Sequence, residues 1–85
     1  MGKYTVEIIP KAEKEFLKLP EKVKTSITNK ILSLEDNPRP FGSKKLKEIE
    51  YYRIRVGDFR VVFSIDDSNK KVKVLSIAHR KEVYR

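Results

Sequence analysis

The clearest alternation of apolar and polar residues lies in Ile49 to Ile65 (IEYYRIRVGDFRVVFSI), on both sides of a central Gly57-Asp58. Alternation with a period of two is typical of β-strands, and a glycine-containing pair suits a two-residue turn that requires a positive φ. We therefore expect a hairpin in which Val56 faces Phe59 and Arg55 faces Arg60. One face of this hairpin is apolar and fit for a core; it carries Tyr52, Ile54, Val56, Phe59, Val61 and Phe63.

The opposite face of the hairpin is basic. It collects Arg53, Arg55 and Arg60 beside Tyr51 and Val62. Like charges placed opposite one another destabilise a sheet, by about 0.2–1 kcal/mol for a cross-strand pair. A solvated basic face is one interpretation. A site built for a polyanion is the sharper one, because the planar guanidinium fork matches phosphate oxygens.

The first half of the chain predicts one strand and two helices. Residues 3–9 (KYTVEII) alternate as a half-buried strand does. Pro10 suits the first position of a short helix that ends at Pro20, and a second helix follows until Asn37-Pro38. An apolar stripe at helical spacing marks the buried side of this second helix: Val23, Ile27, Ile31 and Leu34.

Residues 37–47 (NPRPFGSKKLK) are predicted to form a loop, since two prolines and a glycine oppose regular structure. The loop ends in a basic cluster, made of Lys44, Lys45 and Lys47. These lysines could simply be solvated. Alternatively, they could contact the phosphate backbone of a nucleic acid, which positions a ligand without performing chemistry.

Residues 71–78 (KVKVLSIA) read as the last strand, after a turn at Asp66 to Lys70. A two-residue loop at Ser68-Asn69 would place Val72 opposite Ile65 and Val74 opposite Phe63. Strict alternation would then put Leu75, Ile77 and His79 on the arginine face. The tail HRKEVYR has the polar composition of a frayed end, and pattern alone favours that interpretation over a functional site.

Together these elements predict an α+β fold with the order β-α-α-β-β-β, in one domain covering residues 1–85. The N-terminal strand and the helical hairpin would precede a three-stranded antiparallel meander. Both helices would pack on the apolar face of the resulting sheet, because neither amphipathic helix is stable alone.

Charge is distributed unevenly along the chain. The 20 Lys+Arg and 12 Asp+Glu residues give a net charge of +8, of which +2 falls in residues 1–40 and +6 in residues 41–85. This asymmetry indicates a nucleic-acid or acidic protein partner. With no cysteine and one histidine, we expect no metal and no cofactor. No stretch has the length of a membrane span, and the expected location is the cytoplasm.

The candidate chemistry is metal-free cleavage of RNA by its own 2′-OH. A protein can catalyse this reaction by aligning the hydroxyl, neutralising charge on the phosphorane and moving protons. The arginines could supply the charge. His79 or Tyr84 could move a proton, although a surface histidine and a hydrophobic anchor are the plain alternatives. Tyr51 could be a surface aromatic or a platform for base stacking.

The order strand-helix-helix, then YYRIRVGDFRVVFSI, then VLSIAHRKEVY resembles the RelE branch of the RelE/ParE toxin superfamily over almost the whole chain. The resemblance implies a metal-independent, ribosome-dependent endoribonuclease that cuts mRNA in the A site and inhibits translation. It also implies a cognate antitoxin as partner. By position, the basic pair of the family's catalytic site falls on Arg53 and Arg55, and its strand arginine on Arg60. The arginine of the family's final motif falls on Arg80, and its tyrosine on Tyr84.

This chain departs from some RelE-like toxins, which carry lysines where Arg53 and Arg55 stand. Arginine cannot serve as a base in practice, so a base would have to come from elsewhere, with His79 as a candidate. Two alternatives remain. One is a ParE-like DNA gyrase inhibitor without nuclease activity; the other is a non-catalytic nucleic-acid-binding module.

Overall fold

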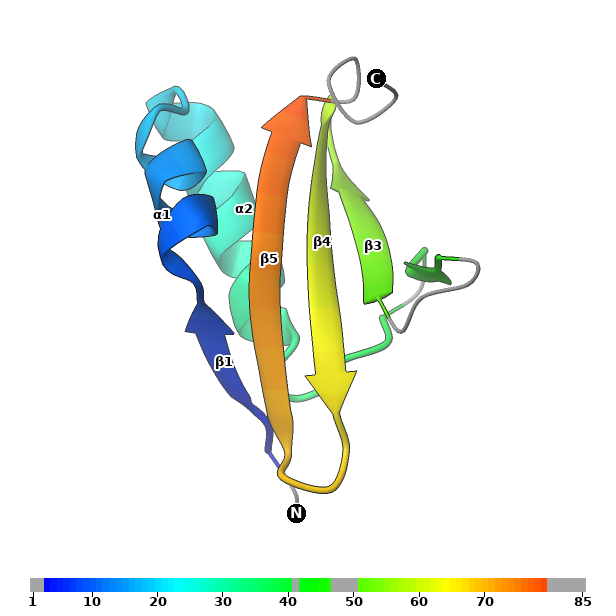
Figure 1. Cartoon of the computed structure of the whole chain (residues 1–85). Coiled ribbons are helices and arrows are strands. Elements are labelled where there is room, and N and C mark those ends of the chain that lie inside the picture. The colour runs from blue at the N-terminus through cyan, green and yellow to red at the C-terminus, as the bar shows by residue number, and fades with distance from the viewer. Residues whose placement is uncertain (1–2, 41, 47–50, 80–85) are drawn as a thin grey trace.

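The computed structural model describes residues 3–40, 42–46 and 51–79. A five-stranded sheet has the order β1-β5-β4-β3-β2. Helix α2 covers one of its faces, and no helix of the described residues covers the other (Figure 1). The strands are β1 (Thr5–Ile8), β2 (Lys44–Lys45), β3 (Tyr51–Val56), β4 (Phe59–Asp66) and β5 (Lys71–His79). The helices are α1 (Pro10–Leu17) and α2 (Glu21–Ser33).

The central hairpin has the predicted register. Val56 pairs with Phe59, Arg55 with Arg60 and Tyr52 with Phe63. Gly57 has φ +60°, and a glycine at the first central position is what a type II′ turn requires. The predicted alternation of the two faces is therefore confirmed across β3 and β4.

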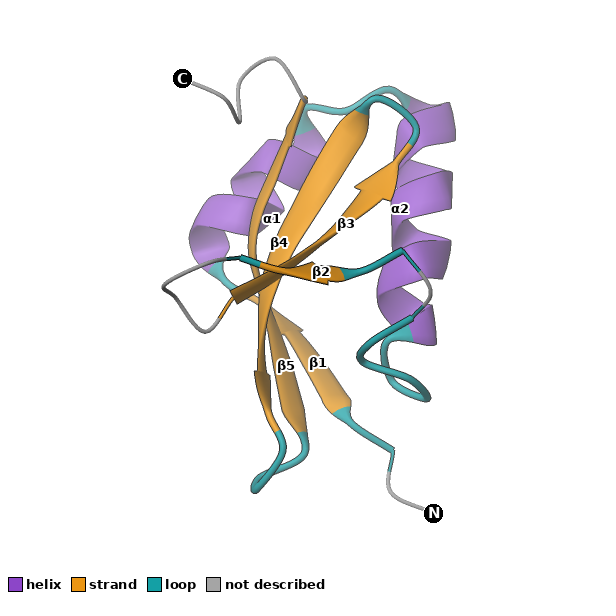
Figure 2. Cartoon of the chain, turned by 90° about the vertical axis from the view of Figure 1, so that its right-hand side faces the viewer, coloured by secondary structure: helices purple, strands orange, loops and turns teal. Residues whose placement is uncertain are grey.

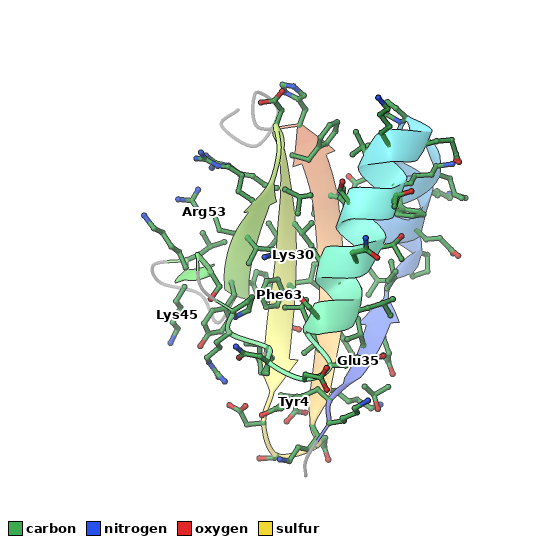
Figure 3. The ribbon with its side chains drawn as sticks, turned by 180° about the vertical axis from the view of Figure 1, so that it is seen from behind. Tyr4, Lys30, Glu35, Lys45, Arg53 and Phe63 are labelled. Carbon is green, nitrogen blue, oxygen red and sulfur yellow. The ribbon has the colours of Figure 1, made fainter. Side chains whose placement is uncertain are left out.

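Both helices begin at the predicted prolines and bury the predicted side. Pro10 is the first residue of α1, and Pro20 is the N-cap of α2. Ile27, Ile31 and Leu34 are buried, as the apolar stripe predicts. They share the core with Phe63 of the sheet, which is labelled beside α2 in Figure 3. Together with one residue of α1 and residues of all three long strands they form the core, which consists of Ala12, Ile27, Ile31, Leu34, Ile54, Val61, Phe63, Val72, Val74 and Ile77.

The first strand joins the far side of the sheet from the hairpin. β1 pairs in parallel with the lower half of β5, from Thr5 opposite Lys71 to Ile8 opposite Val74. Beyond Ile8 the chain turns into α1, which lies alongside the upper half of β5 (Figure 1). There the Glu15 carboxylate accepts a hydrogen bond from the Ile77 amide at 2.8 Å. A helix side chain thus satisfies an edge amide that β1 is too short to reach.

A β-bulge corrects the predicted faces of the last strand. Ile65 pairs with Val72 and Phe63 with Val74, as expected, but the register shifts between Val62 and Phe63. Leu75 is the extra residue, because Val62 pairs with Ser76 rather than with Leu75. The prediction that Ile77 shares the arginine face is therefore wrong. Ile77 pairs with Val61 and is buried in the core.

The predicted loop at residues 37–47 contains a short strand. Lys44 pairs with Arg53 and Lys45 with Tyr52, so β2 adds a two-residue edge to the sheet. Figure 2 shows β2 crossing in front of β3. Within the described residues, neither helix is long and apolar enough to cross a membrane.

Candidate nucleic-acid interface

The arginine face of the hairpin forms a cationic hollow of about 330 Å³. Its walls come from β3, β4 and the segment that leads into β2. Four of the lining side chains are cationic, and no carboxylate is among the lining residues in the described ranges. The lining consists of Gly42, Lys44, Arg53, Ile54, Arg55 and Arg60.

Pairing of the strands explains why these cations converge. Directly opposed residues share a face of a sheet, so the Lys44–Arg53 and Arg55–Arg60 pairs bring two cations each to the open side. Gly42 has φ +93°, a conformation that is unfavourable for residues with a Cβ. The chain can therefore turn toward Lys44 at the rim of the hollow.

Arg60 differs from the other three cations in its burial. Only 2% of its surface is exposed, and its Nη1 atom is buried. Arg55 is exposed and Arg53 is intermediate. Electrostatic attraction is stronger where water is excluded. The hollow thus has a desolvated guanidinium at its base and more accessible cations around it, an arrangement suited to an anion such as phosphate.

The other predicted contact residues divide between the two sides. Tyr51 precedes Arg53 by two residues on β3, on the same face, and is 41% exposed. It is therefore available as a stacking platform beside the hollow. Lys45 is exposed but pairs with Tyr52, whose ring stacks on Phe63 at a centroid distance of 6.0 Å on the opposite face. Figure 3 shows Lys45 and Arg53 on the β2–β3 side of the sheet, away from the helices.

The placement of His79 corrects a prediction. Strict alternation put His79 on the face of Arg60, but the bulge at Leu75 reverses the parity of the residues that follow it. His79 pairs with Phe59, and their rings meet edge to face at 5.3 Å. It lines a separate cleft with Glu15, Leu19 and Pro20 on the helix side. The structure thus does not bring His79 together with the arginines.

Three predicted residues lie outside the described residues: Lys47, Arg80 and Tyr84. Gly42 was not predicted as part of the site, and its position in a loop is the only sequence signal for it. The residues that anchor this loop were not predicted either. Arg39 and Asp67 are 28 positions apart yet form a bidentate pair, with nitrogen–oxygen distances of 3.3 and 2.9 Å.

Fold and site together define a small basic α+β protein with a cationic hollow on its sheet. Residues 6–84 match the family described as "ParE toxin of type II toxin-antitoxin system, parDE". The chain therefore belongs to this family, within the RelE/ParE superfamily that the sequence resembles.

Relatives with RelE in their names are similar along nearly the whole chain. The toxin RelE of Mycobacterium tuberculosis is 33% identical, over 96% of this chain and 87% of the relative. The putative toxin RelE1 of Methanocaldococcus jannaschii is 31% identical, over 98% of this chain and 97% of the relative. RelE in the RelE-RelB complex of Pyrococcus horikoshii superposes with a TM-score of 0.83 at 30% identity, covering 94% of this chain and 97% of that one.

Proposed function

We propose that this toxin is a ribosome-dependent endoribonuclease that cleaves mRNA in the ribosomal A site and thereby inhibits translation. The observation that supports this proposal is the cationic hollow, with Lys44, Arg53 and Arg55 around the buried Arg60. Preorganised positive charge in a poorly hydrated position stabilises developing negative charge more effectively than the same charge in water.

In the proposed reaction, the 2′-oxygen of a nucleotide attacks the adjacent phosphorus and the 5′-oxygen leaves. The product is a 2′,3′-cyclic phosphate. Arg60 and its neighbours would neutralise the additional charge on the phosphorane. They would not remove the proton from the 2′-OH, because arginine does not deprotonate in proteins. The ribosome would hold the RNA in line for attack, a task for which this shallow site offers few groups of its own.

The proton-transfer group is proposed to be Tyr84 rather than His79. His79 contacts Phe59 on the helix side of the sheet, whereas the hollow opens on the other side. Arg80 and Tyr84 keep the roles that the resemblance to RelE gives them: charge stabilisation for Arg80 and proton transfer for Tyr84.

A cognate antitoxin is the proposed protein partner. Several solved relatives are complexes of a RelE toxin with RelB, among them those from Pyrococcus horikoshii and Mycobacterium tuberculosis. A toxin with a net charge of +8 would favour an antitoxin segment rich in acidic residues.

The test is primer extension on a reporter mRNA in a reconstituted translation reaction. The variants are Arg60→Ala, Arg55→Ala and the control Lys14→Ala. Lys14 is exposed on α1 and does not line the hollow, so its removal changes the net charge equally. We expect cuts at the A-site codon that require ribosomes and fall by roughly a hundredfold in Arg60→Ala. Arg55→Ala tests the same hollow at an exposed position, where shortening the side chain leaves the core intact.

The alternative function is inhibition of DNA gyrase, which the ParE designation of the matching family favours. Uncut mRNA and normal protein synthesis with the wild-type protein would contradict the nuclease proposal. Loss of gyrase supercoiling activity in the same preparation would then support the alternative. Equal cleavage by the Arg55, Arg60 and Lys14 variants would show that the nuclease acts through a site other than the hollow.

A further inference from the structure

A polar cluster at the lower end of the sheet ties together four segments that are distant in sequence. Arg39 follows α2, Asp67 lies in the turn between β4 and β5, Tyr4 precedes β1 and Tyr52 lies in β3. We call these four residues the Arg39 clamp. The clamp lies on the face opposite the hollow, because Tyr52 stacks on the core residue Phe63.

Arg39 is held from several directions. Its Nη1 and Nη2 atoms donate to the two oxygens of Asp67 at 3.3 and 2.9 Å. Its Nε donates to the Tyr52 hydroxyl at 3.3 Å, and the guanidinium carbon lies 5.2 Å from the centre of the Tyr52 ring. A bidentate pair with an added aromatic contact fixes the orientation of a guanidinium, which a single contact would not do.

Asp67 is held in turn by the N-terminal segment. The Tyr4 hydroxyl donates to Asp67 Oδ1 at 2.7 Å, and the Tyr4 amide donates to the Glu35 carbonyl at 2.8 Å. Figure 3 shows Tyr4 and Glu35 close together below α2. The hydrogen bonds from Arg39 and then Tyr4 lower the pKa of Asp67 to about 2, so the carboxylate is ionised at neutral pH.

The clamp fixes the beginning of the segment that carries Lys44 to the hollow. Immediately after Arg39, the Ser43 amide donates to the Pro40 carbonyl at 2.9 Å, and Lys44 then pairs with Arg53. At the other end, the Leu46 amide donates to the Tyr51 carbonyl at 2.8 Å. A two-residue strand such as β2 makes few hydrogen bonds of its own, so its position depends on the contacts of the residues before and after it.

We propose that the Arg39–Asp67 pair is a positioning device that holds the segment after α2 so that Lys44 stays at the rim of the cationic hollow. Asp67 thus assists anion binding although it is an acidic residue on the far face of the sheet. This inference rests on the hollow being the anion site of the proposed function.

The sign of the effect makes the proposal testable. Asp67→Asn removes a negative charge from a basic protein, so simple electrostatics predicts tighter binding of a polyanion. The proposal predicts weaker binding, because the released segment must be ordered again when the anion binds. Arg39 and Asp67 are both substantially exposed, and exposed pairs add little to global stability. The variant should therefore remain folded.

The experiment measures binding of a short fluorescein-labelled oligouridylate, 2′-O-methylated to prevent cleavage, by fluorescence anisotropy. Asp67→Asn should weaken binding by about three- to tenfold, reflecting the ordering of a few residues. Arg39→Lys, which keeps the charge but loses the fork, should weaken it similarly. Asp66→Asn is the matched control. Asp66 is the neighbouring residue, at the end of β4, and its substitution changes the charge equally, but its carboxylate accepts hydrogen bonds from Asn69.

Amide hydrogen exchange provides a second readout. In Asp67→Asn, exchange at the Leu46 amide should rise while amides shared by β4 and β5 keep their protection. Wild-type or tighter binding by Asp67→Asn would overturn the proposal, as would a uniform rise in exchange across the sheet. Arg55→Ala separates the two hypotheses. If this variant binds as tightly as the wild type, the hollow is not the anion site and the proposed function loses its support; if it binds weakly while Asp67→Asn does not, only the clamp fails.

Discussion

At the level of single residues, burial sets the Arg60 guanidinium apart from the more exposed cations around it. A guanidinium with 2% of its surface exposed loses most of its hydration, which is unfavourable unless nearby groups compensate. The proposed function gives this burial a use, because a guanidinium with little water around it attracts a phosphate more strongly than an exposed guanidinium does.

His79 yields a prediction at the same scale. Replacement by phenylalanine should keep the edge-to-face contact with Phe59 while removing the titratable group. Since His79 lies on the face away from the hollow, we expect His79→Phe to cleave mRNA within about threefold of the wild-type rate, well short of the 10²–10⁴-fold loss typical of an acid–base residue.

Single-turnover cleavage on purified ribosomes measures this effect, with Tyr84→Phe in parallel. We expect the tyrosine variant to lose most of its rate while its ribosome binding is retained. A large loss in His79→Phe at unchanged ribosome affinity would restore His79 as a proton-transfer group.

At the level of elements, a hydrogen bond across the sheet edge helps to position α1, whose Ala12 is also buried in the core. Glu15 bonds both the Ile77 amide at 2.8 Å and the Lys11 ammonium at 2.9 Å. Burial alone would raise the pKa of Glu15, but these two donors outweigh burial and lower it. The carboxylate is thus ionised at neutral pH and serves as the partner that a longer β1 would otherwise provide.

Glu15→Ala should leave the Ile77 amide without its acceptor and lower the free energy of unfolding by about 1–3 kcal/mol. Glu15→Gln keeps an acceptor oxygen, so its loss should be smaller. Urea denaturation followed by circular dichroism measures both effects. Glu13→Ala, on the same helix and exposed, is the control; a loss in this control equal to that in Glu15→Ala would show that helix charge, and not the edge amide, explains the result.

The bulge at Leu75 is the element that reorganises the last strand. It allows Val72 and Val74 to share the core with Ile77, although alternation alone cannot place all three on one face. The extra residue therefore serves the core, and it separates His79 from the arginines as a consequence.

At the level of the whole molecule, the two faces of the sheet differ in what they carry. The helices lie on the face that holds the core (Figure 1). The opposite face carries the cations of the hollow. The net charge of +8 should also attract nucleic acid at long range, in a manner that salt screens.

Salt dependence can distinguish this general attraction from contacts in the hollow. For a single-stranded nucleic acid, each phosphate contact contributes about −0.7 to the slope of log K against log salt concentration. Arg55→Ala should therefore make the slope shallower by about 0.7 for the methylated oligouridylate. Lys14→Ala should leave it nearly unchanged, whereas an equal change in both variants would indicate diffuse attraction without a defined site.

The sequence by itself determined the local features of this protein. The hairpin register follows from Gly57-Asp58, and the helix starts follow from Pro10 and Pro20, because these residues constrain the backbone directly. The alternation around the turn likewise predicted that Arg53, Arg55 and Arg60 share a face. Each of these features depends only on residues that are close together along the chain.

Only the tertiary structure decided the features that depend on distant segments. The bulge at Leu75 arises because β5 must pair with β4 and β1 while filling the core beneath α2, and no local signal in KVKVLSIA marks it. The parallel pairing of β1 and the contact between Arg39 and Asp67 join segments with no pattern in common. Local backbone preferences thus established where the cations lie along their strands, whereas packing of the whole chain established which side chains they meet.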